Sequence, residues 1–131
     1  MSSSQSAVAK PLSAASLPKG CFKPADGYLV VMNNYGYNDS VLEGAGPSKS
    51  WPVISVPQNT TVNITVCNAD PAETHGFQIS NYYDSKIVAV SPGDVIHVSF
   101  TATKVGSFRI YCAIFCTIHP FMEDGELQVM S

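Results

Sequence analysis

Short runs of alternating apolar and polar residues dominate this chain, and no stretch repeats with the period of an amphipathic helix. In 61–66, Val62, Ile64 and Val66 fall on one face of a predicted strand, and 95–101 alternates in the same way. Other short apolar segments predict further strands, at 27–33, 53–57, 77–79, 86–90, 107–112 and 126–130.

Turn-forming residues separate these segments. Pro57 and Asn59 place a turn between two strands, and SPGD at 91–94 places another. We expect a long loop that includes 35–37 and the Gly-, Pro- and Ser-rich 43–50. Seven or eight short strands with closely spaced turns predict an all-β antiparallel sandwich or barrel.

The length and composition fit one globular domain. With 131 residues, of which 45% are hydrophobic, the chain can bury a core without help from disulfides. We expect a domain at 21–131, preceded by a Ser- and Ala-rich segment, 1–20, that is either a flexible arm or the stub of an N-terminal anchor. This segment lacks the basic start and the apolar block of a signal peptide.

The charge balance narrows the classes of partner. The formal net charge is −3, and such mild acidity argues against nucleic acid and anionic membrane surfaces, which favour basic proteins. No apolar run approaches the ~20 residues of a membrane-spanning helix, so we expect no membrane span in this chain.

Two of the four cysteines, Cys21 and Cys67, stand apart, each beside a predicted strand. The favoured interpretation is a pair of buried free thiols, and the alternative is a disulfide, which would indicate an oxidising compartment. Asn-x-Ser/Thr triplets begin at Asn38, Asn59 and Asn63, but the pattern is short and adds only a little support for an extracytoplasmic location.

The other two cysteines belong to a dense group of soft metal ligands. Together with a histidine and a methionine they fall within eleven residues, on the turn between the last two predicted strands: Cys112, Cys116, His119 and Met122. His75 ends a polar loop just before a strand and offers one more donor, and the glycine after it would let another backbone approach. His97 lies inside an alternating strand as an outward-facing residue, and we exclude it from the site.

Ligand softness favours copper. Thiolate with thioether is a soft donor set, and Met is a poor ligand for zinc, magnesium or calcium. Zinc is the first alternative, since two cysteines and two histidines would satisfy a tetrahedral site, but Met122 would then have no role. A Cys112–Cys116 disulfide is the second, but so tight a loop strains its geometry and leaves both histidines unused.

The arrangement resembles the cupredoxin family, and more narrowly the CuA domain of cytochrome c oxidase subunit II and of nitrous oxide reductase. The resemblance covers about residues 27–131 and rests on THGF at 74–77 together with C-x₃-C…H-x₂-M at 112–122. The run VSPGDVIHVSFTATKVGSFRIYC at 90–112 also matches the family's approach to its first cysteine. The resemblance implies a cupredoxin-like Greek-key β-sandwich or barrel of seven to eight strands.

The same resemblance implies two copper ions bridged by two cysteine sulfurs. The implied ligands are His75, Cys112, Ile114 through its backbone carbonyl, Cys116, His119 and Met122. Each histidine would cap one copper, and the thioether and the carbonyl would be weak axial ligands. Tyr35 and Tyr37 fall where subunit II proteins carry an aromatic stretch near the point at which electrons arrive, although we favour simple loop packing for both.

One departure from the family leaves the number of coppers open. The family usually has three residues between its second cysteine and its histidine, and here only Thr117 and Ile118 intervene. CTIHPFM at 116–122 instead resembles the ligand loop of amicyanin, a mononuclear type 1 blue copper protein, and either natural shortening or a grafted loop would explain it. We favour two coppers. In the one-copper alternative a single cysteine would bind with both histidines and Met122, and the other thiol would be spare.

These residues predict one-electron transfer, with no catalysis by this chain itself. No acid–base pair or nucleophile triad is evident, and a full set of protein ligands leaves no position for a substrate. The resemblance implies the electron-accepting domain of a terminal oxidase. It also implies a cytochrome or small copper protein as donor, a haem–copper oxidase as acceptor, and an extracytoplasmic location with or without a native membrane anchor. A copper-delivery protein is the alternative from another class, and it would need an exposed, incomplete site.

Overall fold

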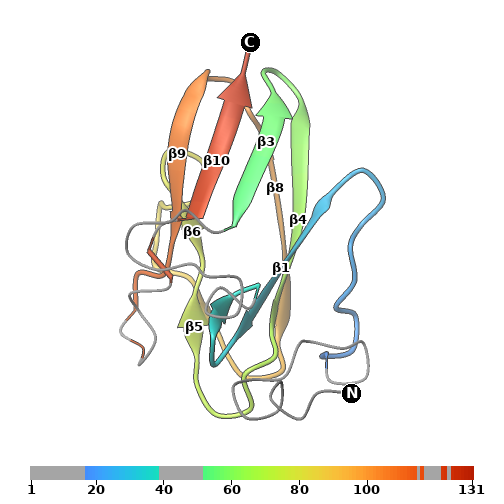
Figure 1. The fold of residues 1–131 in the computed structure, drawn as a ribbon, viewed down its shortest axis with the longest axis vertical. Helices are drawn as coiled ribbons and strands as arrows, with labels where there is room; N and C mark the ends of the chain where they lie inside the picture. Colours follow the sequence, from blue (N-terminus) through green and yellow to red (C-terminus); the bar gives the residue numbers. More distant parts are fainter. Residues whose placement is uncertain (1–16, 39–51, 115, 117–121, 124) are drawn as a thin grey trace, which may run out of the picture.

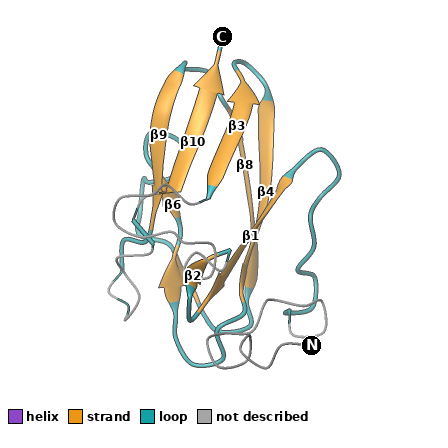
Figure 2. Ribbon diagram, viewed as in Figure 1, coloured by secondary structure: helices purple, strands orange, loops and turns teal. Residues whose placement is uncertain are grey.

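The computed structural model describes residues 17–38, 52–114, 116, 122–123 and 125–131. Within these residues all regular structure is β-strand (Figure 2). The strands are β1 (Tyr28–Asn33), β2 (Gly36–Tyr37), β3 (Val53–Pro57), β4 (Thr61–Asn68), β5 (His75–Gly76), β6 (Gln78–Ile79), β7 (Ala89–Val90), β8 (Val95–Thr101), β9 (Gly106–Tyr111) and β10 (Gly125–Met130). None of the described residues forms a helix of the length and apolarity that a bilayer crossing requires.

The strands form two four-stranded sheets and one small ladder. One sheet has the order β2-β1-β4-β8 and the other the order β3-β10-β9-β6. β5 and β7 pair separately, and β5 lies toward the end of the molecule opposite the C-terminus (Figure 1). The predicted all-β sandwich is therefore confirmed.

Alternating side chains explain why the two sheets pack face to face. β3 buries Ile54 and Val56, and its neighbour β10 buries Leu127 and Val129, with more exposed residues between them. These side chains join those of the other sheet, such as Ile64, in one hydrophobic core. Since burying a Val, Leu or Ile side chain contributes about 1.5–3 kcal/mol, a strand with two such residues is committed to one face.

Two strand pairs are parallel, so the expectation of a wholly antiparallel sandwich is wrong in this detail. β1 pairs with β4 and β3 pairs with β10 in parallel, whereas β4–β8 and β9–β10 are antiparallel as predicted. Alternation in a sequence indicates which face of a strand is buried but says nothing about the direction of its neighbour. The parallel pairs arise because β3 and β4, adjacent along the chain, belong to different sheets.

The shortest strands differ most from the expectation. The structure has ten strands among the described residues, where the sequence predicts seven or eight, and four of the ten contain only two residues. The segment 35–37, expected to be loop, includes β2, which pairs with the end of β1. A two-residue strand is too short to show any alternation, so its existence depends on pairing alone.

A disulfide joins Cys21 to Cys67, so the favoured interpretation of two free thiols is wrong. The Cα atoms of the two residues lie 5.8 Å apart, and the bond attaches the N-terminal segment to β4. Cys21, Val31 and Cys67 form a second, smaller hydrophobic cluster, against which Leu17 packs. Most of the expected arm at 1–20 lies outside the described residues.

Candidate metal centre

The predicted ligand loop is fixed at both ends by β9 and β10. These strands pair antiparallel, with Gly125 opposite Ile110, and the loop between them begins at Cys112. The Cys112 N–H donates to the Met122 carbonyl over 2.8 Å, and the Arg109 Nε–H donates to the Glu123 carbonyl over 2.8 Å. Cys112 and Met122 are thus held at the base of the loop by backbone contacts.

Sulfur atoms gather at this base. The Cys112 and Cys116 Sγ atoms lie 4.0 Å apart as free thiols, so the alternative of a disulfide between them is not formed. The Cys116 Sγ lies 3.8 Å from the Met122 Sδ, and the Ile114 carbonyl oxygen lies 3.1 Å from the Cys112 Sγ. Both cysteines and Met122 are 2% exposed or less, so the three sulfurs are shielded from water.

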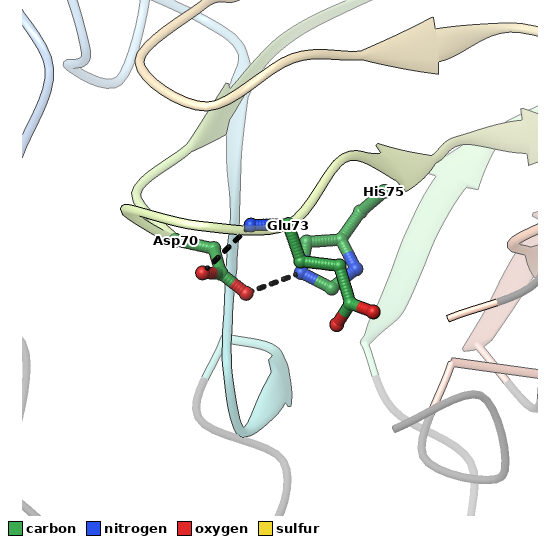
Figure 3. A group of neighbouring side chains, drawn as sticks. All are labelled: Asp70, Glu73 and His75. Carbon is green, nitrogen blue, oxygen red and sulfur yellow. Dashed lines mark hydrogen bonds and ion pairs between the residues drawn. The ribbon is translucent and has the colours of Figure 1, made fainter. Parts of the chain in front are cut away.

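His75 lies in the separate β5–β7 ladder, where it pairs with Val90. Its side chain is fully buried, and its Nε2 lies 2.8 Å from the Asp70 Oδ2. The other ring nitrogen, Nδ1, points away from Asp70 and has no hydrogen-bond partner among the described residues (Figure 3). A buried, unpaired ring nitrogen costs free energy, so an unmet ligand is the natural explanation.

Asp70 was missed by the sequence analysis, although it controls the imidazole. Its Oδ1 accepts hydrogen bonds from the Ala72 and Glu73 N–H groups over 2.9 and 3.1 Å, and its Oδ2 accepts from His75. Burial raises the pKa of Asp70, but these hydrogen bonds outweigh it and leave the pKa below its ordinary value. The carboxylate is therefore ionised at neutral pH and accepts from the Nε2–H, which orients the ring with Nδ1 directed away from Asp70.

Glu73 adds a second carboxylate beside this pair. Asp70, Glu73 and His75 each offer one possible ligand atom, and these three atoms lie within 4.8 Å of one another (Figure 3). Both Asp70 oxygens already accept hydrogen bonds, so we assign the group to holding the imidazole rather than to an ion of its own.

Gly76 connects His75 to the sulfur cluster. Its N–H donates to the Cys112 Sγ over 3.2 Å. A Cβ atom on this residue would lie 3.1 Å from the Ala113 backbone nitrogen and 3.2 Å from the Cys112 Sγ, so a side chain would press on both. The expectation that this glycine permits another backbone to approach is confirmed.

Contacts join four of the six predicted ligands, namely Cys112, Ile114, Cys116 and Met122. His75 is connected to them through its neighbour Gly76, and His119 lies outside the described residues. His97 is exposed on β8, where its ring lies 3.2 Å from the Thr65 hydroxyl, so its exclusion from the site is confirmed.

The donors fit a soft metal ion. A metal–thiolate bond of about 2.3 Å would allow one ion to contact two sulfurs that lie 4.0 Å apart. Thioether and imidazole complete a set that suits copper better than a hard cation.

Comparisons with known proteins support the fold and the family resemblance. No family model matches the chain. Over 77 residues the chain is 33% identical to nitrous-oxide reductase of Pseudomonas fluorescens and 35% identical to that of Ralstonia nicotianae. The match covers 57% of this chain but only 12% of each reductase, so the chain is similar to a small part of much longer proteins.

Solved structures agree on the architecture. Auracyanin from Roseiflexus castenholzii matches with a TM-score of 0.59 at 15% identity, over 82% of this chain and 98% of that one. The periplasmic domain of subunit II of cytochrome oxidase from Bradyrhizobium japonicum matches with a TM-score of 0.56 at 20% identity, over 82% and 86% of the two chains. The predicted Greek-key sandwich class is confirmed.

Proposed function

We propose that this chain, which has a cupredoxin-like fold, binds copper and transfers single electrons. The observation that carries the proposal is the unpaired Nδ1 of buried His75, whose neighbour Gly76 donates to one of two buried cysteine sulfurs that lie 4.0 Å apart without a disulfide between them. Without a partner, the buried ring nitrogen costs free energy. With a soft metal, the imidazole and both thiols become ligands.

We favour two copper ions bridged by Cys112 and Cys116. Both sulfurs are buried and face each other, and the Cys116 Sγ also lies 3.8 Å from the Met122 Sδ, so neither thiol is displaced from the cluster. His75, Met122, the Ile114 carbonyl and His119 would complete the set. The shortened Cys116–His119 spacing favours the alternative of a single type 1 copper, in which one thiol is spare.

The chain's own residues would keep the site in one geometry through a redox cycle. Bound copper supplies the one-electron couple. Asp70 fixes the His75 ring, and the backbone contact between Cys112 and Met122 fixes two sulfurs at the loop base. Burial excludes water from the sulfurs. Ligands that lie on a strand or in a loop fixed by two paired strands cannot easily rearrange when the charge of the site changes, which suits rapid electron transfer.

The burial of His75, Cys112, Cys116 and Met122 favours electron transfer over copper delivery, which would require an exposed and labile site. The Cys21–Cys67 disulfide supports an extracytoplasmic location, since disulfides persist in oxidising compartments. We propose a small redox protein, either a cytochrome or a copper protein, as the donor, and a haem–copper oxidase as the acceptor. The fold likeness to the periplasmic subunit II domain supports this choice.

Copper counting and electron paramagnetic resonance test the proposal. Oxidised protein with two coppers sharing one unpaired electron should bind two ions per chain and give a seven-line hyperfine pattern. Cys112→Ser and Cys116→Ser should each abolish that pattern, because each removes a bridge. Cys21→Ser with Cys67→Ser is the matched control and should leave the pattern unchanged, since those sulfurs lie in the separate cluster.

Two other outcomes would contradict the proposal at different levels. If the protein binds one copper per chain, gives a four-line pattern and tolerates one of the two Cys→Ser substitutions, the site holds a single type 1 copper and not two ions. A colourless protein that retains zinc after exposure to both metals in equal amounts would overturn copper altogether.

A further inference from the structure

Tyr37 is a fully buried residue that the proposed ligand set does not use. Its ring packs edge-on against Phe77, with ring centroids 6.2 Å apart. Its hydroxyl donates to the Gly76 carbonyl over 2.6 Å, although the two residues are 39 positions apart in the sequence. Tyr37 therefore lies inside the molecule and not on a surface where a redox partner could dock.

Both backbone polar groups of Gly76 form hydrogen bonds. Its carbonyl accepts from the Tyr37 hydroxyl, and its N–H donates to the Cys112 Sγ over 3.2 Å. Gly76 itself has no side chain to restrict its backbone, and glycine is the residue with the greatest conformational freedom. The Tyr37 hydroxyl is thus a specific restraint on the group that donates to the sulfur.

We propose that Tyr37 is a positioning residue of the copper centre, whose hydroxyl fixes Gly76 so that the Gly76 N–H stays directed at the Cys112 sulfur. The inference rests on the proposed function. Hydrogen bonds around a cysteine ligand tune the reduction potential of the metal. A donor near the sulfur stabilises the more electron-rich, reduced centre, so Tyr37 raises the potential.

The surroundings keep this donor in place. Burial holds the pKa of Tyr37 well above its ordinary value, so the phenol keeps its proton. If the hydroxyl were lost, the Gly76 carbonyl would remain buried without this partner, and the backbone would shift to relieve it. The N–H on the same residue would then move relative to the sulfur.

The test compares Tyr37→Phe with Tyr82→Phe in copper-loaded protein. Tyr82 is the matched control because its hydroxyl also donates to a backbone carbonyl, that of Lys104 over 3.1 Å, in an exposed contact on another part of the fold. Tyr37→Phe should lower the equilibrium constant for one-electron reduction roughly threefold to tenfold, the factor of one ordinary hydrogen bond. That is about 30–60 mV in potential. The thiolate-to-copper absorption should shift, and Tyr82→Phe should change neither quantity.

Two further measurements keep the inference testable if Tyr37→Phe folds poorly. In the metal-free protein, the Gly76 amide resonance should move in Tyr37→Phe and not in Tyr82→Phe. Replacement of Tyr37 by 3-fluorotyrosine, a stronger donor, should shift the potential upward. An unchanged potential in every folded Tyr37 variant would overturn the inference and leave the proposed function standing, whereas a parent protein without copper would overturn the proposed function itself.

Discussion

At the scale of single residues, the Asp70 carboxylate is the group on which the geometry of His75 depends. It accepts three hydrogen bonds while almost completely buried, and one of them comes from the imidazole. Asp70→Asn should lower the free energy of unfolding by about 1–3 kcal/mol, because hydrogen bonds to a charged acceptor are lost. Copper affinity should fall about 10–100-fold, since the imidazole loses its anchor.

Urea unfolding of metal-free protein and competition with a copper chelator measure the two effects. Asp84→Asn is the matched control, because Asp84 is exposed and accepts a hydrogen bond from the Asn81 N–H. An Asp70→Asn protein with parental affinity and stability would show that His75 needs no anchor.

The same carboxylate sets a pH dependence. Its pKa in the folded protein lies below the unfolded value of about 3.9. The unfolded chain therefore binds this proton more tightly, so the contribution of Asp70 is fully present above that value and is lost as the pH falls through the folded pKa. Metal-free parent protein should lose stability more steeply below about pH 4 than Asp70→Asn does.

The residues that sequence alone could identify in the site are those marked by their own chemistry. Cys112, Cys116 and Met122 stand out because soft ligands are rare and closely spaced, and His75 because a loop and a glycine flank it. Asp70 is an ordinary acid five positions before a histidine, and only the folded loop brings its oxygen to Nε2. The hydroxyl of Tyr37 meets Gly76 across two separate sheets, a contact that no local pattern encodes.

At the scale of elements, the attachment of the N-terminal segment to β4 carries a large share of stability. The Cys21–Cys67 disulfide closes a loop with a sequence separation of 46 residues. The double variant Cys21→Ser with Cys67→Ser should lose about 2–5 kcal/mol, because the unfolded chain regains loop entropy. Denaturant unfolding without reductant measures the loss. A double variant as stable as the parent would show that packing of the segment is sufficient.

Strands long enough to show alternating apolar and polar residues were predictable from the sequence, whereas the pairing of one strand with another was not. β8 runs from Val95 to Thr101, the range expected from its alternation. β5 and β7 have two residues each, and they form because Gly76 and Ala89 meet in a ladder rather than because of their own sequence. The disulfide was unpredictable for a similar reason, since its formation requires the N-terminal segment to lie across the outer side of β4.

At the scale of the whole molecule, the core packs between two sheets and does not depend on the ligands. The buried Val, Ile and Leu side chains of β3, β4 and β10 supply most of it, and Cys112, Cys116 and Met122 join the same cluster. Removal of copper by a chelator should leave the far-ultraviolet circular dichroism unchanged and lower the melting temperature. At copper a thousandfold above its dissociation constant, binding adds about 4 kcal/mol to stability. Loss of the strand signal with the metal would contradict a preformed site.

The four cysteines also constrain how the chain can be produced. One pair is a disulfide and the other is two free thiols, so a single oxidant must act on Cys21 and Cys67 and spare Cys112 and Cys116. Four cysteines allow three complete pairings, and in two of these both the N-terminal segment and β4 would be linked to the ligand loop. During synthesis the N-terminal pair emerges first, before any competing thiol is available. When the finished chain is refolded under oxidising conditions, all four thiols are present at once. We then expect isomers with wrongly paired cysteines.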